Sequence, residues 1–443
     1  MTFEWLEALR EDCEMTISEI PFRESCEWNI DEEEIVHKTG GFFSIVGLQA
    51  SSSISDGRGW EQPIINQPEV GILGFLVTTT GDENHFLVQG KAEPGNIGLV
   101  QFAPTVQATF SNYTRKHGGD ETAYLEHFTE TEANETLLSD SLQSEQGTRF
   151  FRKFNRNVVV KIPYPMPLHG KYFSWLSAEA VREALHMNYV VNTDARSVLV
   201  CAPWELLSAT KQLFDNPKAR QTFGGLAAVS YKTKSERDIV DRAQRMLRRL
   251  RDQIALDVEL CGLRNLTGWS VGESTIKGAN GNGAMVVKHY RVHAPEREKT
   301  DWDQPLVSST DEDEIQLIAQ VRKGVLRFLL MPSVEIGLTG GVELGPSYKR
   351  ESHVCSMEYP EIISDSKRFR EIVTVRQSDE GGRFMRACST YKVVEVPEEV
   401  DLNTGRHDEG LWVTLCELEA LCREPGLLTN EARSVVSLLL GLA

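Results

Sequence analysis

Residues 89 to 117 gather side chains that can hold a polyhydroxylated ligand and move protons. The stretch "KAEPGNIGLVQFAPTVQATFSNYTRKHGG", residues 91 to 119, combines lysine, glutamate, tyrosine and histidine with several glutamine and asparagine amides. Amides and charges inside a packed strand cost free energy unless a partner satisfies them. A sugar is such a partner, so we expect these side chains to line a sugar pocket.

The ionisable side chains of this stretch suit proton abstraction and the stabilisation of an oxyanion. A base works best with a pKa near ambient pH, which favours His117 or a desolvated Glu93. Lys91 or Tyr113 can donate a hydrogen bond to a developing oxyanion. Two structural alternatives stay open, since Glu93 could hold the turn that follows it and Tyr113 could be a packed ring. The side chains expected to hold sugar hydroxyls are Gln89, Asn96, Gln107, Thr109 and Asn112.

The elements that must position these residues are written twice along the chain. "GWEQPII" at 59–65 returns as "DWDQPLV" at 301–307, and the same separation of 242 residues carries Glu93 to Glu335. Further on, "SEQGTRFFR" returns as "SDEGGRFMR", and "NTDARSVLV" is echoed by "TNEARSVVS". Similarity that keeps its order and spacing indicates an ancient tandem duplication.

Each copy alternates like a series of strands and then changes to a helical period. A helix is expected from Ser177, and Ser235 with Asp238 forms a capping box before a helix that opens the second copy. A repeated sheet with helices predicts an α+β fold of two similar domains, 1–225 and 226–443, related by a pseudo-twofold axis.

The two copies differ where the reactive side chains lie. Lys91 stands opposite Ser333 and Gln107 opposite Lys349 at the separation of 242 residues. Reactive groups persist only in a copy that still carries out the reaction. We therefore expect the active site in domain 1–225.

The residues kept in both copies allow two interpretations. In the first, they form strand ends and turns; in the second, they belong to two nucleotide-binding sites. In the second interpretation the tryptophans stack on bases, and the arginines hold phosphate in bidentate fashion. In the first copy the retained residues are Trp60, Gln62 and Arg149, and Arg152, Lys153 and Arg156 add a basic cluster beside them. The second nucleotide site is expected to contain the retained Trp302, Gln304, Arg383 and Arg386, together with Tyr348.

Composition restricts the classes of partner. The formal net charge of -18 and the pI near 5.1 argue against a nucleic-acid binder. The eight cysteines show no CxxC pair or zinc-site spacing, so no metal site is expected. The N-terminus lacks the pattern of a signal peptide, and no apolar run reaches the roughly 18 residues of a membrane span. We expect a cytoplasmic protein with no membrane partner.

The motifs "EQPIINQPEVGILGF", "KAEPGN", "PTVQATFSNY", "HGG" and "SEQGTRFFRKFNRN" occur in order. With them the chain resembles the NDP-hexose 2,3-dehydratases of deoxysugar biosynthesis over nearly its whole length. The resemblance implies two Nudix-like domains, a homodimer and the substrate dTDP-4-keto-6-deoxyglucose. It implies no cofactor, because the ketone of the substrate already activates the neighbouring C–H bond. An NAD(P)H-dependent 3-ketoreductase would consume the unstable diketo product.

Two other functions stay open at this point. A metal-dependent Nudix-type nucleotide-sugar diphosphatase would use the REXXEE element, which this sequence lacks. A non-catalytic nucleotide-sugar-binding protein would not need the polar series of residues 89 to 117.

Overall fold

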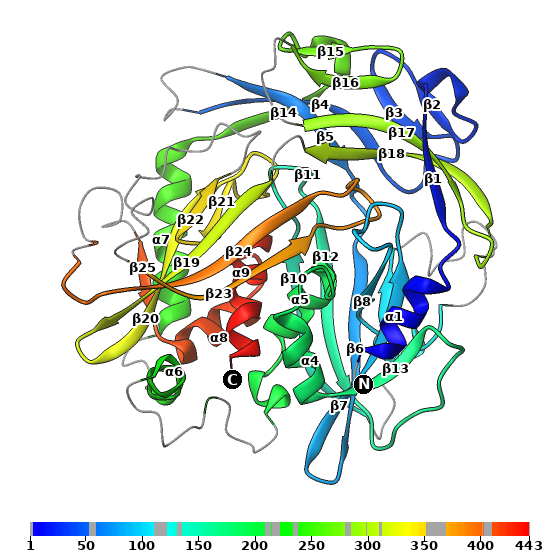
Figure 1. Cartoon of the computed structure of the whole chain (residues 1–443). Helices are drawn as coiled ribbons and strands as arrows, with labels where there is room; N and C mark the ends of the chain where they lie inside the picture. The colour runs from blue at the N-terminus through cyan, green and yellow to red at the C-terminus, as the bar shows by residue number, and fades with distance from the viewer. Residues whose placement is uncertain are drawn as a thin grey trace.

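The computed structural model of the chain is a mixed α+β fold (Figure 1). The structure describes residues 3–52, 59–109, 122–130, 135–208, 214, 222–233, 238–279, 285–297, 299–309, 312–350, 369–400, 402 and 410–442. Among the helices in these ranges, none combines the length and the apolar character that a bilayer span requires.

Two seven-stranded mixed sheets form the body of the molecule. The first contains β6 (Gly71–Thr80), β7 (Glu83–Ala92), β8 (Val100–Ala103), β9 (Val106–Ala108), β10 (Thr136–Ser144), β12 (Phe154–Lys161) and β13 (Phe173–Ser177). The second contains β19 (Asp313–Arg322), β20 (Val325–Val334), β21 (Val342–Gly345), β22 (Tyr348–Arg350), β23 (Arg370–Ser378), β24 (Cys388–Val396) and β25 (Leu411–Val413). The bounds of β6 to β9 recur in β19 to β22 at the separation of 242 residues.

The central strand β6 is buried throughout its first eight residues, because both faces of the sheet are covered. Leu73 and Phe75 face a core that includes helices of both halves, whereas Ile72 and Leu76 face a second cluster. Strands that are buried on both faces have long hydrophobic runs, as is typical of parallel sheets. Strand β6 fits this pattern and pairs in parallel with β12.

Two smaller sheets lie together above the large ones in Figure 1. One contains β2 (Trp28–Ile30), β3 (Glu34–His37), β4 (Ser44–Ser51), β5 (Trp60–Asn66), β11 (Phe150–Phe151) and β14 (Asp257–Cys261). The other contains β1 (Thr16–Ile20), β15 (Trp269–Val271), β16 (Thr275–Gly278), β17 (Met285–His293) and β18 (Asp301–Ser309).

The two halves of the chain exchange one strand each. Strand β1 pairs antiparallel with β17, with Thr16 opposite His293, and β14 pairs antiparallel with β4, with Asp257 opposite Ser51. Each half therefore completes a sheet of the other half. This reciprocal pairing joins the two halves at the end of the molecule where the small sheets lie.

The helices fill the space between the large sheets and cover their outer sides. They are α1 (Glu4–Glu11), α3 (Glu126–Thr129), α4 (Ala178–Leu185), α5 (Thr193–Cys201), α6 (Phe223–Lys232), α7 (Ile239–Ile254), α8 (Leu415–Arg423) and α9 (Asn430–Gly441). The start of α4 confirms the prediction, because Ser177 caps it by accepting from the Ala180 amide. The predicted capping box is wrong, because Asp238 is itself the N-cap of α7 and accepts from the Val240 and Asp241 amides. Ser235 lies outside the described residues.

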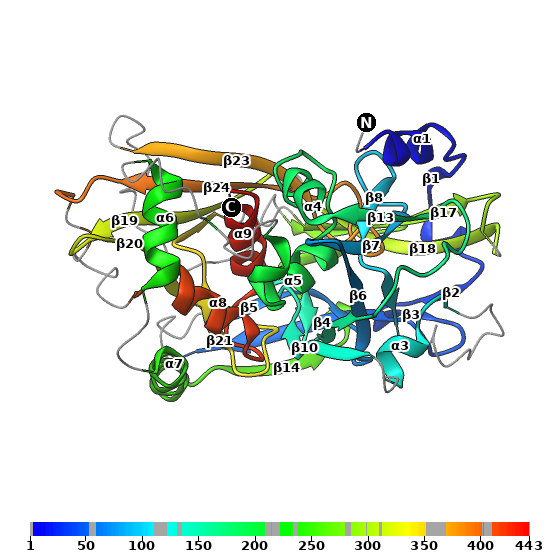
Figure 2. The ribbon, with the colours of Figure 1, turned by 90° about the horizontal axis from the view of Figure 1, so that it is seen from below.

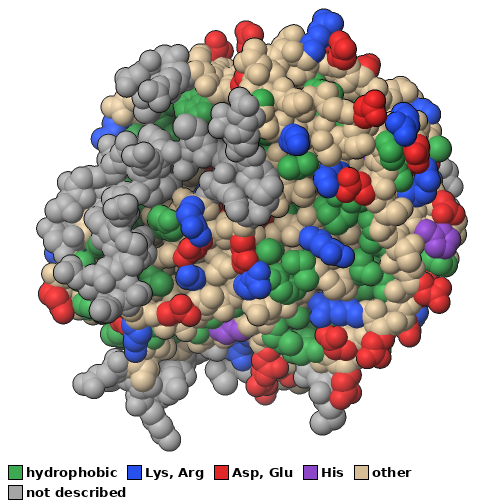
Figure 3. All heavy atoms as spheres, turned by 45° about the horizontal axis from the view of Figure 1, so that its top comes forward, with side chains coloured by type: hydrophobic (Ala, Val, Ile, Leu, Met, Phe, Trp, Pro, Cys, Tyr) green, Lys and Arg blue, Asp and Glu red, His purple; other side chains and the backbone are tan. Residues whose placement is uncertain are grey.

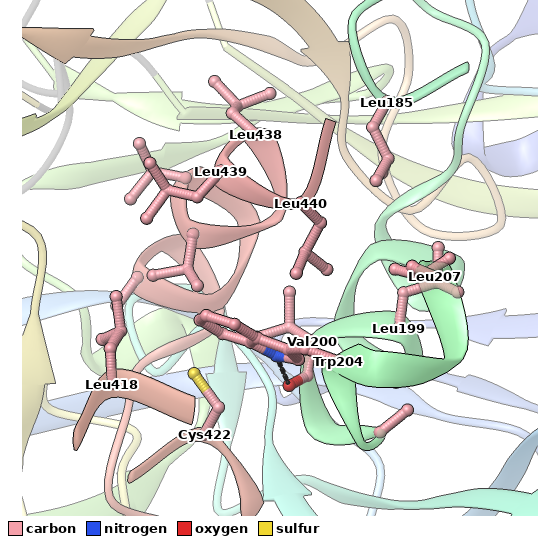
Figure 4. Close-up of a cluster of buried hydrophobic side chains, with 14 of the residues drawn as sticks. Leu185, Leu199, Val200, Trp204, Leu207, Leu418, Cys422, Leu438, Leu439 and Leu440 are labelled. Carbon is pink, nitrogen blue, oxygen red and sulfur yellow. Dashed lines mark hydrogen bonds between the residues drawn. The ribbon is translucent and has the colours of Figure 1, made fainter. Parts of the chain in front are cut away.

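Helices α5 and α9 pack against each other between the two large sheets (Figure 2). Each carries a fully buried arginine: Arg196 donates to the Val191 carbonyl at 2.6 Å, and Arg433 reaches the Ser197 hydroxyl of α5 at 2.9 Å. Around them Trp204 packs among leucines of α5, α8 and α9, with its indole N–H on the Val200 carbonyl (Figure 4). The core is therefore shared by both halves.

Candidate active site

A cavity of about 520 Å³ lies between the two halves of the chain. The first half contributes Lys91 from β7, Gln107 from β9 and Asp194 from the first turn of α5. The second half contributes Trp302 and Gln304 from β18 together with Glu380 and Arg383 from the loop after β23. The site is thus composite.

A hydrogen-bonded network connects the reactive side chains of the first half. The Lys91 ammonium lies 3.6 Å from Glu93 Oε1 and donates to the Gln107 carbonyl at 3.2 Å. The Gln107 amide donates to the same Glu93 oxygen at 3.1 Å and accepts from the Asn192 amide at 3.0 Å. The network fixes the lysine and the glutamate side by side at the cavity wall.

The loop that follows Glu93 docks on the loop 380–386 of the second half. The Gly95 amide donates to the Gly381 carbonyl at 2.8 Å, and the Arg386 amide donates to the Gly95 carbonyl at 2.8 Å. A Cβ atom on Gly95 would lie 1.7 Å from the Phe384 carbonyl oxygen, so only glycine permits this approach. The docking brings Glu380 to the same cavity as Glu93.

The carboxyl groups of Asp194 and Glu380 share this wall of the cavity. Burial raises the pKa of Asp194 well above its ordinary value, and the neighbouring carboxylates of Glu380 and Glu145 raise it further. Burial likewise raises the pKa of Glu380, partly offset by Arg383. Both groups are therefore biased toward the protonated form.

Cationic side chains line another part of the cavity. The Arg383 guanidinium donates to Gln67 Oε1 at 3.1 Å and lies 4.3 Å from the ring centre of Phe43. Arg297, an exposed residue, lies 5.5 Å from the ring centre of Trp302. Lys153 is buried and donates to the Glu69 carbonyl, and burial lowers its pKa. These cations suit a diphosphate.

Aromatic rings form a third wall. The ring of Trp28 lies 4.8 Å from that of Phe43 and 5.2 Å from that of His37. Trp28 is fixed by a hydrogen bond from its indole to the Asp303 carbonyl at 2.7 Å. The Asp303 carboxylate, in turn, accepts from the Cys26 amide and from His289. Burial opposes its ionisation, but these hydrogen bonds outweigh burial and hold the pKa of Asp303 at about 2.

The equivalent region of the second half is filled by ion pairs. Lys349 lies 3.0 Å from Glu335 and 2.9 Å from Glu431, all of them buried. Arg149 is held at 2.8 Å by Asp313 and at 2.6 Å by Asp379. These charges satisfy one another inside the protein.

The structure divides the predicted site residues into four groups. The large cavity is lined by Lys91, Glu93, Gln107, Thr109, Trp302, Gln304 and Arg383. A neighbouring cavity of about 370 Å³, also bordered by Lys91 and Gln107, is lined by Gln89. Outside the lining of both cavities lie Trp60, Gln62, Asn96, Arg149, Arg152, Arg156, Tyr348 and Arg386. Outside the described residues lie Asn112, Tyr113 and His117.

The residues that lie outside both cavities have contacts within the protein. The Gln62 amide donates to the Thr148 carbonyl at 2.7 Å, and the Arg156 guanidinium makes a bidentate contact with Asp140. Asn96 is buried and donates to Glu93 Oε2 at 3.4 Å, so it supports the glutamate from behind.

Sequence reasoning missed Asp194, Glu380, Arg297 and the aromatic group around Trp28. Asp194 and Glu380 both lie in motifs that return in the other copy. The available signal for Glu380 was a difference between the copies, since its counterpart in the first copy is Gln146. Asp194 offered no such signal, because its counterpart Glu431 is also acidic. Within the described ranges, no group of three or more histidine, cysteine, aspartate or glutamate side chains is arranged to hold a metal ion. Acidic and basic side chains are interspersed over the face shown in Figure 3.

Comparisons with known proteins identify the family of the chain. The family model described as NDP-hexose 2,3-dehydratase matches residues 1–202 and 241–439. Three relatives named dTDP-4-dehydro-6-deoxy-alpha-D-glucopyranose 2,3-dehydratase are similar to the chain. The one from Amycolatopsis orientalis is 33% identical over 98% of this chain and 88% of its own length. The one from Saccharopolyspora spinosa is 33% identical over 94% and 86%, and the one from Streptomyces violaceoruber is 30% identical over 95% and 92%. The chain belongs to the NDP-hexose 2,3-dehydratase family.

Proposed function

We propose that this chain removes water across C2 and C3 of dTDP-4-keto-6-deoxy-D-glucose and gives dTDP-3,4-diketo-2,6-dideoxy-D-glucose. The observation that carries the proposal is the composite cavity, in which Lys91, Glu93 and Gln107 share one space with aromatic and cationic walls. The three curated relatives, whose names state this substrate and reaction, support it.

The mechanism follows from the ketone at C4. Glu93 takes the proton from C3, and the electron pair of the C–H bond moves to the C4 oxygen as an enolate. Lys91, held 3.6 Å from Glu93 Oε1, donates a hydrogen bond to that oxygen. The C4 carbonyl then re-forms, a C2–C3 double bond appears, and the C2 hydroxyl leaves with a proton as water. The remaining enol takes a proton at C2 and loses one from its hydroxyl, which gives the diketone.

The nucleotide would occupy the part of the cavity away from Lys91. The thymine ring stacks on the aromatic wall around Trp28 or on the ring of Trp302, both of which line the cavity. The diphosphate lies against Arg383 and Lys153. Arg383 is prepared for this role because Gln67 and the ring of Phe43 orient its guanidinium before a ligand binds. Preorganised donors lose less entropy on binding.

We also propose that the fold arose by duplication of a Nudix-like domain, with halves 1–225 and 226–443 related by a pseudo-twofold axis. The matching bounds of β6 to β9 and β19 to β22 support the duplication. So does the matching bulge at Leu137/Ser139 in β10 and at Glu371/Val373 in β23. A homodimer and a downstream NAD(P)H-dependent 3-ketoreductase complete the proposal, the second because the diketone is unstable.

Incubation with the dTDP-ketosugar in the presence of a chelator tests the function by mass spectrometry. Dehydration yields a product lighter by one water. Release of thymidine monophosphate would indicate a diphosphatase, and unchanged substrate that stays bound would indicate a binding protein.

A further inference from the structure

Asp194 and Glu380 are the two acidic residues of the cavity wall whose carboxyl groups have no partner in the part of the chain that the structure describes. Among the described residues, neither carboxyl group makes a hydrogen bond or an ion pair within 4 Å, although Asp194 is only 4% exposed. Glu93, in contrast, is held by Gln107 and Asn96. Asp194 is buried, and a buried carboxyl group without a partner is costly, so its place on the cavity wall points to a ligand. Glu380 is half-buried and lines the same cavity.

The duplication provides an internal comparison for these two positions. Glu431 is the counterpart of Asp194 and is fixed by Lys349 at 2.9 Å. Gln146 is the counterpart of Glu380 and uses its amide to donate to Asp379 at 3.2 Å. In the copy that lacks the lysine, Glu431 and Gln146 bind other residues of the protein. In the copy that has Lys91, Asp194 and Glu380 line the cavity instead.

The geometry places the pair next to the proposed base. A Cβ atom on Gly382 would lie 3.4 Å from Glu380 Oε1 and 3.7 Å from Glu93 Oε1, so these two oxygens are at most about 7 Å apart. Asp194 is fixed to this wall by α5, whose N-cap Asn192 also donates to Gln107. One hexose ring can therefore contact Glu93 and the pair together.

We propose that Asp194 and Glu380 together form the acid that protonates the departing C2 hydroxyl group, so that the second half supplies a reacting group. The inference rests on the proposed dehydration. As the C2–O bond breaks, its electron pair takes the proton of the pair and leaves as water, while the enolate electrons form the C2–C3 double bond. After this step the Asp194–Glu380 pair is anionic and Glu93 carries the proton from C3. The pair then takes up a proton from solvent and Glu93 releases its proton to solvent. The raised pKa of each carboxyl group agrees with a proton held before reaction.

The test separates proton removal at C3 from loss of the hydroxyl. Asp194→Asn and Glu380→Gln are incubated with the dTDP-ketosugar in D₂O, and deuterium at C3 is followed beside water loss. Without the acid, dehydration falls by roughly 10²- to 10⁴-fold while C3 exchange continues near the wild-type rate. Glu93→Gln should lose both reactions. Glu11→Gln, an exposed position at the end of α1, serves as the control for handling.

A 2-fluoro analogue of the ketosugar gives a second measurement, because fluoride leaves without needing a proton. Elimination of fluoride by Glu380→Gln should stay close to that by the wild type. Wild-type dehydration rates in both variants, or loss of C3 exchange together with dehydration, would overturn the acid role. Failure of the wild type itself to dehydrate would refute the proposed function instead. Calorimetry with dTDP and a thermal melt confirm that each variant is folded.

Discussion

Exchanging Glu343 for glutamine should stabilise the protein, and only at neutral and alkaline pH. Glu343 lies in β21, is 3% exposed and accepts from the Ser144 hydroxyl at 2.6 Å. The position 242 residues earlier is Gln101, which is equally buried and donates to the Ser378 hydroxyl at 2.8 Å. The same buried position thus holds a carboxyl group in one half and an amide in the other.

The magnitude follows from the pKa of Glu343. Burial raises this pKa from 4.5 to about 7, with Ser144 and Arg433 offsetting part of the effect. Since the folded carboxyl group binds its proton more tightly than the unfolded one, stability falls as pH rises from about 4.5 to about 7 and is constant above that. A pKa difference of about 2.5 corresponds to about 3 kcal/mol. Glu343→Gln should recover about this amount at pH 8, and this pH-dependent part should vanish near pH 4.5.

Thermal melts of wild type and variant from pH 4.5 to 8 measure this difference. The gap between the two melting temperatures should widen with pH in favour of Glu343→Gln. The reciprocal variant Gln101→Glu places a carboxyl group at the equivalent site and should lose stability at pH 8. Melting curves that stay parallel across the pH range would refute the reasoning, because an uncharged packing effect does not depend on pH.

Two further variants test the site, and a third tests the buried ion pairs. Lys91→Met should lower kcat by roughly 10²- to 10³-fold with little change in affinity for dTDP, measured by steady-state kinetics and calorimetry; an equal loss of affinity would assign the lysine to binding instead. Arg383→Ala should weaken dTDP binding by about tenfold or more, because a charge-assisted contact contributes about 1.5 to 3 kcal/mol; unchanged calorimetry would contradict the phosphate role. Arg149→Ala should cost about 3–5 kcal/mol of stability, since it leaves Asp313 and Asp379 buried without their cation; an unchanged melting temperature would refute this.

Local patterns in the sequence predicted the elements well. The capping serine of α4 and the fixed separation between the two sets of strands depend on short-range signals, and both are present in the structure. The exchange of β1 and β14 depends on pairing between segments more than 200 residues apart in the chain. Periodicity carries no information about which distant strand a segment joins.

The composite nature of the site escaped prediction for the same reason. The repeat assigned Trp302, Gln304 and Arg383 to a second nucleotide site, whereas the loop contacts at Gly95 bring them to the cavity that contains Lys91. The repeat also did not show why Arg149 is held in buried ion pairs whereas its counterpart Arg383 lines the cavity.

A single position explains much of that difference. Arg149 is held inside the protein by Asp313, but the residue equivalent to Asp313 in the first half is Gly71, which lines the cavity. No carboxylate at position 71 competes for the Arg383 guanidinium, which therefore stays at the cavity wall, oriented by Gln67. The sequence shows that Gly71 replaces the aspartate, but only the fold shows that this position lies opposite an arginine.

The claim that one cavity, built by both halves, holds the whole substrate is tested most directly by a crystal structure of Glu380→Gln with the dTDP-ketosugar bound. The proposal predicts the diphosphate against Arg383 and the hexose between Lys91 and Glu93, with C3 facing the glutamate. A ligand bound beside Trp60 and Arg149, with Lys91 and Glu93 away from the hexose, would contradict it.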